Sequence, residues 1–383
     1  MRAASVSDYR ELARRRLPKI FFEYIDGGSY AEVTLKRNVA DLEAIALRQR
    51  VMRDMSALDM SVTTLGQALA MPIVLAPVGM AGMYARRGET QAAKAAKAAG
   101  VPFCLSAMGV CDAEEVAAAA GTPPWYQLYM LKDRGYMREL LGRVRALGCP
   151  VLVFTVDLPM PGARYRDVRS GFTGSSGLSG AINQAWDGLT HPEWMWDVWA
   201  HGRPHSLGSV AGAVSGKQGR VTDFLSWIAR NFDRSVTWKD MDWVRETWDG
   251  PIVIKGVLDA EDARSAAKAG AQGLVVSNHG GRQLDGVRSS ISALPRIVDA
   301  VGSDLEVYMD GGVRSGLDVL KAMALGARAC LIGRAWAYAL GAGGEEQVSR
   351  MLGTLKSELA VAMVLTGCAN LRDAGRNLLD TDV

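Results

Sequence analysis

Eight short apolar segments recur along this chain of 383 residues, and most of them are followed by an alanine-rich stretch of helical character. Several segments are continuously apolar and rich in β-branched residues, as expected of strands that are buried on both faces. The helical stretches between them end at Gly or Gly-Ala, a common helix stop signal. The eight segments are residues 73–77, 102–106, 125–129, 151–157, 251–255, 273–278, 305–310 and 329–333.

Eight alternating strand–helix units predict an α/β fold, a single (β/α)8 TIM barrel spanning residues 1–383. A doubly wound sheet is the alternative, but its first strand would be expected to lead into a GxGxxG turn. Here the first segment leads into Pro77-Val78-Gly79-Met80 instead, which favours the barrel. Helices are expected within residues 88–100, 133–148, 260–271 and 315–327.

A long insertion follows the fourth strand, because Asp157 and Lys255 stand much further apart than an ordinary βα loop allows. Within it, residues 222–232 and 237–248 carry apolar residues at helical spacing behind the N-cap candidates Thr222 and Thr237. Residues 170–220 are rich in Gly, Ser and Trp. They predict either a surface flap packed on the barrel or a peripheral membrane contact, since Trp favours the bilayer interface. The tryptophans concerned are Trp186, Trp194, Trp196 and Trp199.

Composition excludes several classes of function. The net charge is only +3 and no run of Lys and Arg exceeds three residues, so nucleic-acid binding is not expected. The five cysteines are scattered and form no CxxC pair, which indicates reduced thiols in a reducing compartment. The four His are too dispersed to predict a metal site. Neither a signal peptide nor a transmembrane helix is expected, since the N-terminus is polar and no stretch of 18 apolar residues occurs.

Active sites of such barrels lie at the carboxyl ends of the strands. In this chain every predicted strand end carries a polar residue or a glycine, more than chance would be expected to supply. These candidates are Pro77, Val78, Gly79, Ser106, Gln127, Tyr129, Thr155, Asp157, Lys255, Ser277, His279, Asp310, Gly311, Gly312, Gly333 and Arg334.

The segment SNHGGRQLDG (277–286) holds an imidazole, His279, and a guanidinium, Arg282, within one loop. A base beside a fixed cation suits proton abstraction from a small carboxylate-bearing substrate. Arg164 and Arg282 could together hold that carboxylate, although Arg164 could equally be a solvated loop charge. Asp157 could orient His279, or serve as a helix cap or turn residue. Lys255 could be a Schiff-base lysine, half of an ion pair, or a charge beside a cofactor.

The last two strand ends indicate a phosphate site. MDGGVRSG (309–316) and IGRAW (332–336) follow strands seven and eight, where barrel phosphate sites commonly lie. Glycines let backbone N–H groups approach an anion, and Arg314 or Arg334 adds positive charge. Either glycine cluster alone would be interpreted as a turn. The occurrence of both clusters, after strands seven and eight, favours a phosphate-binding site.

Five motifs resemble the FMN-dependent L-2-hydroxy acid dehydrogenase and oxidase family, and the resemblance runs from about Ser5 to the C-terminal helix. They are FFEYIDGGSY, LAPVGMAGMYARRGE, TVDLPMPGARYRD, IKGVLDAEDA and SNHGGRQLDG. Within the family, HPEWMWDVWAHGRPH and NFDRSVTWKDMDWVRETWDGPIVIKG most resemble the bacterial, membrane-associated, quinone-linked L-lactate dehydrogenase branch.

The resemblance implies a role for each matched position. His279 would be the base and Asp157 its partner, while Arg164 and Arg282 would bind the substrate carboxylate. Tyr24, which on pattern alone is a packing residue, would join Tyr129 at the substrate. Lys255 would stabilise the reduced ring of the flavin. Ser106, Gln127, Thr155 and Ser277 would bond the ring together with the backbone of Pro77, Val78 and Gly79, and Asp310, Gly311, Gly312, Arg314, Gly333 and Arg334 would hold the ribityl and phosphate groups.

The expected activity is FMN-dependent oxidation of an L-2-hydroxy acid, L-lactate to pyruvate, with the electrons passed to a quinone. Gly79 favours a dehydrogenase, whereas Met108 could line a pocket for lactate or for a larger side chain. The alternatives within the family are an L-mandelate-type dehydrogenase and a 2-hydroxy acid oxidase that forms hydrogen peroxide. Outside it they are a Schiff-base aldolase using Lys255 and an inactive binding scaffold. By analogy a homotetramer is expected, bound peripherally to the cytoplasmic side of the inner membrane.

Overall fold

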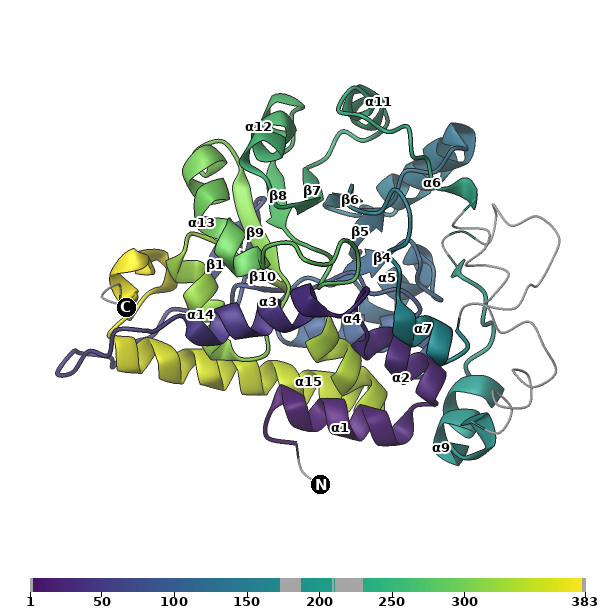
Figure 1. Cartoon of the computed structure of the whole chain (residues 1–383), viewed down its shortest axis with the longest axis horizontal. Coiled ribbons are helices and arrows are strands. Elements are labelled where there is room, and N and C mark those ends of the chain that lie inside the picture. Colours follow the sequence, from purple (N-terminus) through teal and green to yellow (C-terminus); the bar gives the residue numbers. More distant parts are fainter. Residues whose placement is uncertain (1–2, 173–186, 209, 211–229, 381–383) are drawn as a thin grey trace.

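The chain was analysed as a computed structural model that describes residues 3–172, 187–208, 210 and 230–380. Eight parallel strands form one sheet in the order β3-β10-β9-β8-β7-β6-β5-β4 (Figure 1). A parallel bridge between Leu75 and Phe103 joins the two edge strands, so the sheet closes into a barrel. The predicted (β/α)8 architecture is therefore confirmed.

Each predicted apolar segment forms one barrel strand. All but two of these strands are buried at every position; β7 and β9 each have one half-exposed residue. Residues buried on both faces of a strand account for the unbroken apolar runs in the sequence. The strands are β3 (Ile73–Leu75), β4 (Cys104–Ser106), β5 (Trp125–Leu128), β6 (Leu152–Thr155), β7 (Ile252–Val257), β8 (Gly273–Val276), β9 (Glu306–Asp310) and β10 (Cys330–Ile332).

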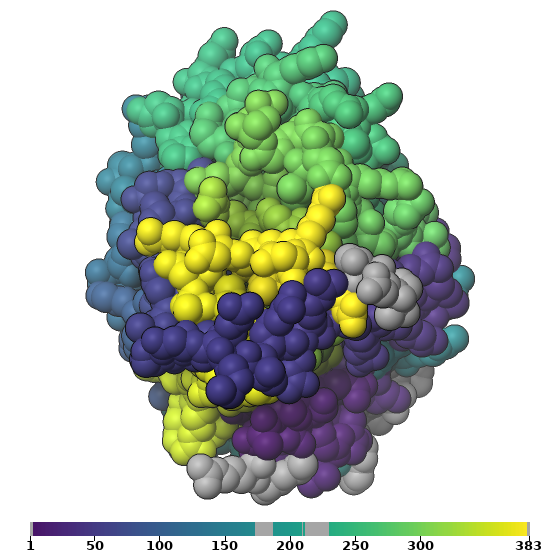
Figure 2. Space-filling view, turned by 90° about the vertical axis from the view of Figure 1, so that its left-hand side faces the viewer, coloured from purple at the N-terminus to yellow at the C-terminus, as the bar shows by residue number. Residues whose placement is uncertain are grey.

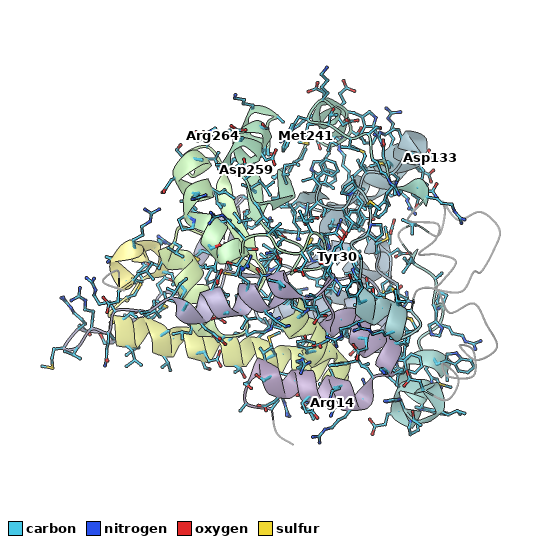
Figure 3. All side chains as sticks on the ribbon, in the orientation of Figure 1. Arg14, Tyr30, Asp133, Met241, Asp259 and Arg264 are labelled. Carbon is cyan, nitrogen blue, oxygen red and sulfur yellow. The ribbon has the colours of Figure 1, made fainter. Side chains whose placement is uncertain are left out.

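Outer helices follow the strands, and most begin at a side-chain cap. Asp112, Asp133 and Asp259 each accept a backbone N–H of the first turn of the helix that they precede. Figure 3 labels Asp133 and Asp259 at the beginnings of their helices. The four helices predicted with bounds are present. The helical pattern after SNHGGRQLDG forms α13, the expected C-terminal helix is α15, and the structure adds α5. The outer helices are α4 (Gly88–Ala98), α5 (Ala113–Ala120), α6 (Arg134–Ala146), α12 (Ala260–Lys268), α13 (Ser290–Val301), α14 (Gly316–Ala324) and α15 (Arg334–Thr366), the last broken at Gly343 and Gly344.

Segments before the first barrel strand cover the outside and close one end. Helices α1 (Val6–Arg16), α2 (Lys19–Asp26) and α3 (Val33–Ala44) precede the barrel, and α1 packs along α15 (Figure 1). The hairpin of β1 (Val62–Thr64) and β2 (Gln67–Leu69) bonds the beginnings of barrel strands, through Thr64 to Glu306 and Gln67 to Trp125. The carboxyl ends of the strands are thus left as the open end.

The C-terminal residues pack against the segment after α3. Leu47 bridges Leu379, and Asp59 bridges Asn370. Figure 2 shows these residues as a yellow layer behind the dark-blue segment. Short 3₁₀ turns complete the fold at η1 (Ala81–Met83), η4 (Leu371–Asp373) and η5 (Arg376–Leu378).

The insertion after β6 is partly described. It contains α7 (Tyr165–Arg169), α9 (Pro192–Trp194), the π-helical η2 (Met195–Ala200) and α11 (Asp240–Thr247). Helix α11 agrees with the prediction for 237–248, but Thr237 does not cap it as expected. Instead, Asp240 accepts hydrogen bonds from the backbone N–H and the hydroxyl of Thr237. Most of the helix predicted at 222–232, and Trp186, lie outside the described residues.

Candidate active site

A cavity opens at the carboxyl ends of the barrel strands and holds about 1190 Å³ of empty space, including some open solvent. Its wall combines residues at most strand ends with Tyr24 and Ile25 of α2. The predicted site residues in the wall are Tyr24, Pro77, Val78, Gly79, Ser106, Met108, Tyr129, Arg164, Lys255, His279, Arg282, Asp310, Gly311, Gly312, Arg314, Gly333 and Arg334.

Four further predicted site residues do not line the cavity but contact residues that do. Gln127 accepts a hydrogen bond from Ser106 at 3.1 Å, and Thr155 is paired in register with Lys255. Ser277 accepts hydrogen bonds from the Lys255 ammonium and the His279 backbone, and Asp157 contacts the His279 ring. The structure therefore brings the whole predicted set to one end of the barrel.

His279 and Asp157 form a hydrogen-bonded pair. The ring Nδ1 of His279 lies 2.9 Å from Oδ1 of Asp157, and their side chains are 19% and 11% exposed. Burial lowers the pKa of His279 below its usual value, although Asp157 opposes the shift. Burial works against the charged form of Asp157, but His279 and Lys255 outweigh it and lower the pKa of that carboxyl. The pair is therefore a neutral imidazole beside a carboxylate at neutral pH.

Backbone geometry fixes the position of the His279 ring. His279 has φ +57°, a left-handed conformation that is uncommon for a residue with a Cβ. Its backbone N–H donates to Ser277 Oγ at 3.0 Å. Because Nδ1 faces Asp157, the neutral ring carries its proton there and leaves Nε2 as an acceptor. Strained backbones of this kind cluster at functional sites.

Lys255 lies between Asp310 and Ser277. Its ammonium is 2.8 Å from Asp310 Oδ2 and 3.1 Å from Ser277 Oγ. Burial disfavours the ammonium, but Asp310 and Asp157 outweigh it and raise the pKa of Lys255. A Schiff-base lysine requires a free amine, so this protonated side chain fits the role of a fixed positive charge. An ion pair was one of the roles that the sequence left open for Lys255, but Asp310 was expected at the ribityl group and was not predicted as the partner.

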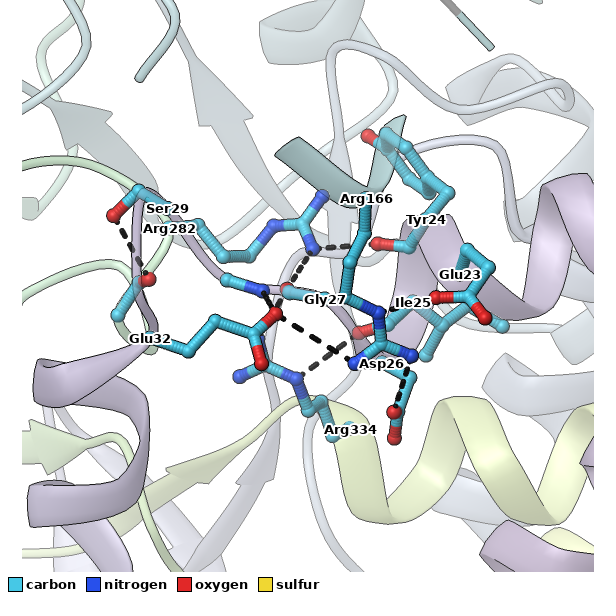
Figure 4. A network of polar contacts seen from close by, with 12 residues as sticks. Glu23, Tyr24, Ile25, Asp26, Gly27, Ser29, Glu32, Arg166, Arg282 and Arg334 are labelled. Atoms are coloured by element: carbon cyan, nitrogen blue, oxygen red, sulfur yellow. Dashed lines mark hydrogen bonds and ion pairs between the residues drawn. The ribbon is translucent and has the colours of Figure 1, made fainter. Parts of the chain in front are cut away.

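Two guanidinium groups converge above Tyr24. The Arg282 group lies 4.7 Å from the ring centroid and the Arg164 group 5.9 Å. Arg282 also donates to the backbone oxygens of Tyr24 and Gly27 (Figure 4). Burial and the charge of Arg282 lower the pKa of Arg164. Two buried like charges in a cavity favour an anion between them, and the planar guanidinium matches a carboxylate.

The end of the cavity at β9 and β10 carries glycines and two further arginines. Arg334 donates to the backbone oxygens of Ile25, Gly27 and Gly280 (Figure 4), an anchoring role that the sequence did not predict. Burial lowers the pKa of Arg334 to about 9, and the charges of Arg282 and Arg314 add to the shift. An anion at this end would relieve that repulsion, as the predicted phosphate site requires.

Several buried polar atoms in the wall or directly behind it have no hydrogen-bond partner among the described residues. They include Gln127 Nε2, Thr155 Oγ1 and Asp310 Oδ1. Leaving such atoms unpaired costs roughly 1–3 kcal/mol each, so they indicate a polar ligand. A polar ring bonded at its edge, with a hydroxylated chain and a phosphate, fits this arrangement of donors, acceptors and cations. The residues present thus fit FMN. No group of three or more His, Cys, Asp or Glu in the described part of the chain could hold a metal ion.

Several wall residues were missed by the sequence analysis. Tyr84 donates its hydroxyl to Gly79 O at 2.8 Å, and burial raises the pKa of that phenol. Phe232 stacks on Tyr129 with ring centroids 5.2 Å apart. Leu158 and Pro161 complete the apolar side of the cavity. The only signal for Phe232 was its place in an apolar pattern; nothing in the sequence indicated which cavity it would face.

The sequence of this chain is similar to those of known proteins. Residues 13–381 match the sequence model of the FMN-dependent dehydrogenase family. The chain is 57% identical to an L-lactate dehydrogenase of Caulobacter vibrioides (strain NA1000 / CB15N), covering 99% of this chain and 98% of that one. It is 56% identical to an L-lactate dehydrogenase of Haemophilus influenzae (strain PittEE), covering 97% and 96%.

The chain is also similar in structure to solved proteins. The crystal structure of the monotopic membrane protein (S)-mandelate dehydrogenase is similar with a TM-score of 0.92, at 32% identity and full coverage of both chains. A mandelate oxidase with (S)-4-hydroxymandelic acid is similar with a TM-score of 0.84, at 37% identity, covering 99% of this chain and 98% of that one.

Proposed function

Because this chain belongs to the FMN-dependent dehydrogenase family, we propose that it oxidises L-lactate to pyruvate and passes the two electrons to a quinone. The observation that carries the proposal is the part-buried His279–Asp157 pair, whose His279 lines the same cavity as Arg164 and Arg282. The full-length likeness to L-lactate dehydrogenases supports lactate as the substrate.

Arg164 and Arg282 bind the substrate carboxylate in this proposal. Their guanidinium groups converge over Tyr24 from different loops, so one carboxylate can meet both. The hydroxyls of Tyr24 and Tyr129 line the same cavity and are placed to orient the substrate. Burial strongly raises the pKa of Tyr129, so its hydroxyl stays protonated and can donate.

His279 accepts the proton as the hydroxy acid is oxidised. The neutral ring presents Nε2 as the acceptor, and Asp157 holds the ring in this tautomer and stabilises the imidazolium that forms. FMN, when bound, accepts the two electrons. Lys255 supplies a fixed positive charge, and the residues that would hold the cofactor are Pro77, Val78, Gly79, Ser106, Gln127, Thr155, Lys255, Ser277, Asp310, Gly311, Gly312, Arg314, Gly333 and Arg334.

Substrate size is decided by the apolar side of the cavity. Met108 lies opposite Gly79, where an added Cβ would come 3.3 Å from the Met108 Cβ. Methionine adapts its shape readily, so a larger 2-hydroxy acid such as L-mandelate is the second candidate. The likeness to mandelate dehydrogenase and mandelate oxidase structures favours this candidate over a change of reaction class.

The insertion at residues 170–220 is proposed to contact a membrane. Leu189, Trp196 and Trp199 are 67%, 71% and 47% exposed, which suits an interfacial contact. Among the helices described, none is long and apolar enough to cross a bilayer. The likeness to a monotopic membrane protein supports peripheral attachment. We place it on the cytoplasmic side of the inner membrane, consistent with the five unpaired cysteines, and propose a homotetramer by family analogy.

The test is lactate turnover by purified protein with either a quinone analogue or oxygen as acceptor, with pyruvate and hydrogen peroxide measured. We expect L-lactate-dependent reduction of the analogue and little peroxide. Abundant peroxide without reduction of the analogue would instead indicate an oxidase. For attachment, Trp196→Ser with Trp199→Ser is expected to move the protein into the soluble fraction, whereas Val361→Ser, a similarly exposed residue on α15, is not. A protein that stays wholly soluble from the outset would overturn the membrane contact.

A further inference from the structure

Helix α3 lies outside the barrel but is held by the loop that carries His279 and Arg282. Asp285 accepts the first two backbone N–H groups of the helix, from Val33 and Thr34. Arg37 donates to Val287 O at 2.7 Å, and Ser289 donates to Asp41. The loop thus follows the helix from its first residue to its third turn.

The innermost of these contacts joins two buried amide side chains. Asn38 Nδ2 donates to Asn278 Oδ1 at 2.8 Å, and Asn278 Nδ2 donates back to Asn38 Oδ1 at 2.7 Å. Both residues are less than 5% exposed. The same atoms also bond the loop backbone, since Gly281 N–H donates to Asn278 Oδ1 and Asn278 Nδ2 donates to Arg288 O. Such a fully paired buried network specifies one arrangement of the backbone.

We propose that Asn38 is a positioning residue for the base: it acts through Asn278 to hold His279 in its left-handed conformation and its ring against Asp157. Asn278 directly precedes His279, and its side chain bonds the backbone of Gly281 and Arg288, so these bonds hold the backbone around His279. An isolated residue with a Cβ does not favour φ +57°, and the surrounding contacts must therefore impose it. The inference rests on the proposed function only in that His279 is the base.

Asn38 also contacts the candidate phosphate loop. A Cβ on Gly311 would lie 3.3 Å from Asn38 Nδ2, and a Cβ on Gly312 would collide with Asn38 O. Both glycines have positive φ, at 91° and 92°. One residue outside the barrel therefore touches both the loop that carries the base and the loop at the phosphate end.

The experiment compares Asn38→Leu, which keeps the size but removes both amide groups, with the milder Asn38→Ser. For FMN-loaded protein we expect kcat to fall about 10- to 100-fold, because a displacement near 1 Å can cost that much, while KM changes less than about threefold. The kinetic isotope effect with 2-deuterated substrate should rise as the chemical step slows. Arg37→Ala, on the same helix and contacting the same loop, is the matched control and should leave kcat within about twofold.

A readout without turnover separates this inference from the proposed function. The chain has four histidines, so 13C-histidine NMR resolves the titration of His279 once His279→Gln has assigned it. In Asn38→Leu or Asn38→Ser we expect the pKa of His279 to shift, because a displaced ring changes both its burial and its contact with Asp157. An unchanged His279 titration with unchanged kcat per bound FMN, even at a lower Tm, would overturn the inference. Wild type that titrates as expected but oxidises no hydroxy acid would refute the function instead.

Discussion

The ring Nδ1 of His279 lies 2.9 Å from Asp157 Oδ1, although 122 positions separate the two residues in the chain. The contact joins the ends of β8 and β6, and it leaves Nε2 of the ring as an acceptor. A base of this kind needs a partner that fixes its tautomer and stabilises its protonated form. Proton abstraction by His279 therefore depends on its contact with Asp157.

Replacing His279 by Gln should abolish most turnover. We expect kcat to fall by about 10²–10⁴-fold, the usual contribution of a positioned base. FMN content and the dissociation constant of pyruvate should stay close to wild type, because the arginines remain. Steady-state kinetics and titration of the flavin absorbance measure both quantities. Turnover within a few-fold of wild type would remove His279 as the base.

The pH profile should show an acid limb set by His279. The base works only when neutral, so kcat/KM should fall as pH falls through its pKa, and burial places that midpoint below the usual value of 6.5. Asp157 raises the pKa of His279, so Asp157→Asn should shift the limb to still lower pH while reducing the plateau. Profiles of kcat/KM between pH 4 and 9 measure the shift. A limb that moves upward in Asp157→Asn would contradict the assignment.

Replacing Arg282 by Lys should raise KM and lower kcat together. The lysine ammonium cannot replace the planar guanidinium, which donates to the backbone oxygens of Tyr24 and Gly27 and is proposed to bind the substrate carboxylate. We expect KM for L-lactate to rise at least tenfold. Arg288→Lys, an exposed arginine on the same loop, is the control and should behave as wild type. An unchanged KM in Arg282→Lys would mean that the guanidinium does not meet the substrate.

Replacing Lys255 by Met should destabilise the protein by removing the partner of a buried carboxylate. Lys255 is 4% and Asp310 7% exposed, and leaving one member of such a pair typically costs about 3–5 kcal/mol. Denaturant unfolding measures the free energy. The double variant Lys255→Met with Asp310→Asn should recover part of the loss, because the uncompensated charge is gone. Equal stability of the single and double variants would argue against the ion pair.

The barrel could be predicted because its signals are local. Strands such as Leu152–Thr155 are buried at every position, so they appear in the sequence as continuous apolar runs. Because the site of such a barrel forms at its strand ends, the sequence also predicts that His279, Asp157 and Lys255 lie together. A helical pattern after SNHGGRQLDG is likewise local, and it forms α13 although Pro295 lies within that helix.

Contacts between distant segments could not be predicted. The Lys255–Asp310 pair, the bonds of Arg334 to the backbone and the amide pair of Asn38 with Asn278 depend on how loops meet in space. A sequence shows which side chains lie at strand ends. It does not show which of their polar groups pair with one another and which remain available to a ligand. Phe232 shows the same limit, since it reaches the cavity from the far end of the insertion.

The most direct test of the central claim is anaerobic stopped-flow absorbance of the purified protein, with L-lactate, D-lactate and L-mandelate added separately. We predict a flavin band at the start and its rapid bleaching by L-lactate, with no comparable bleaching by D-lactate. Bleaching by L-mandelate alone would keep the chemistry and move the substrate to the larger acid, with Met108 the first residue to vary. A flavin band that none of the three acids bleaches would contradict the account.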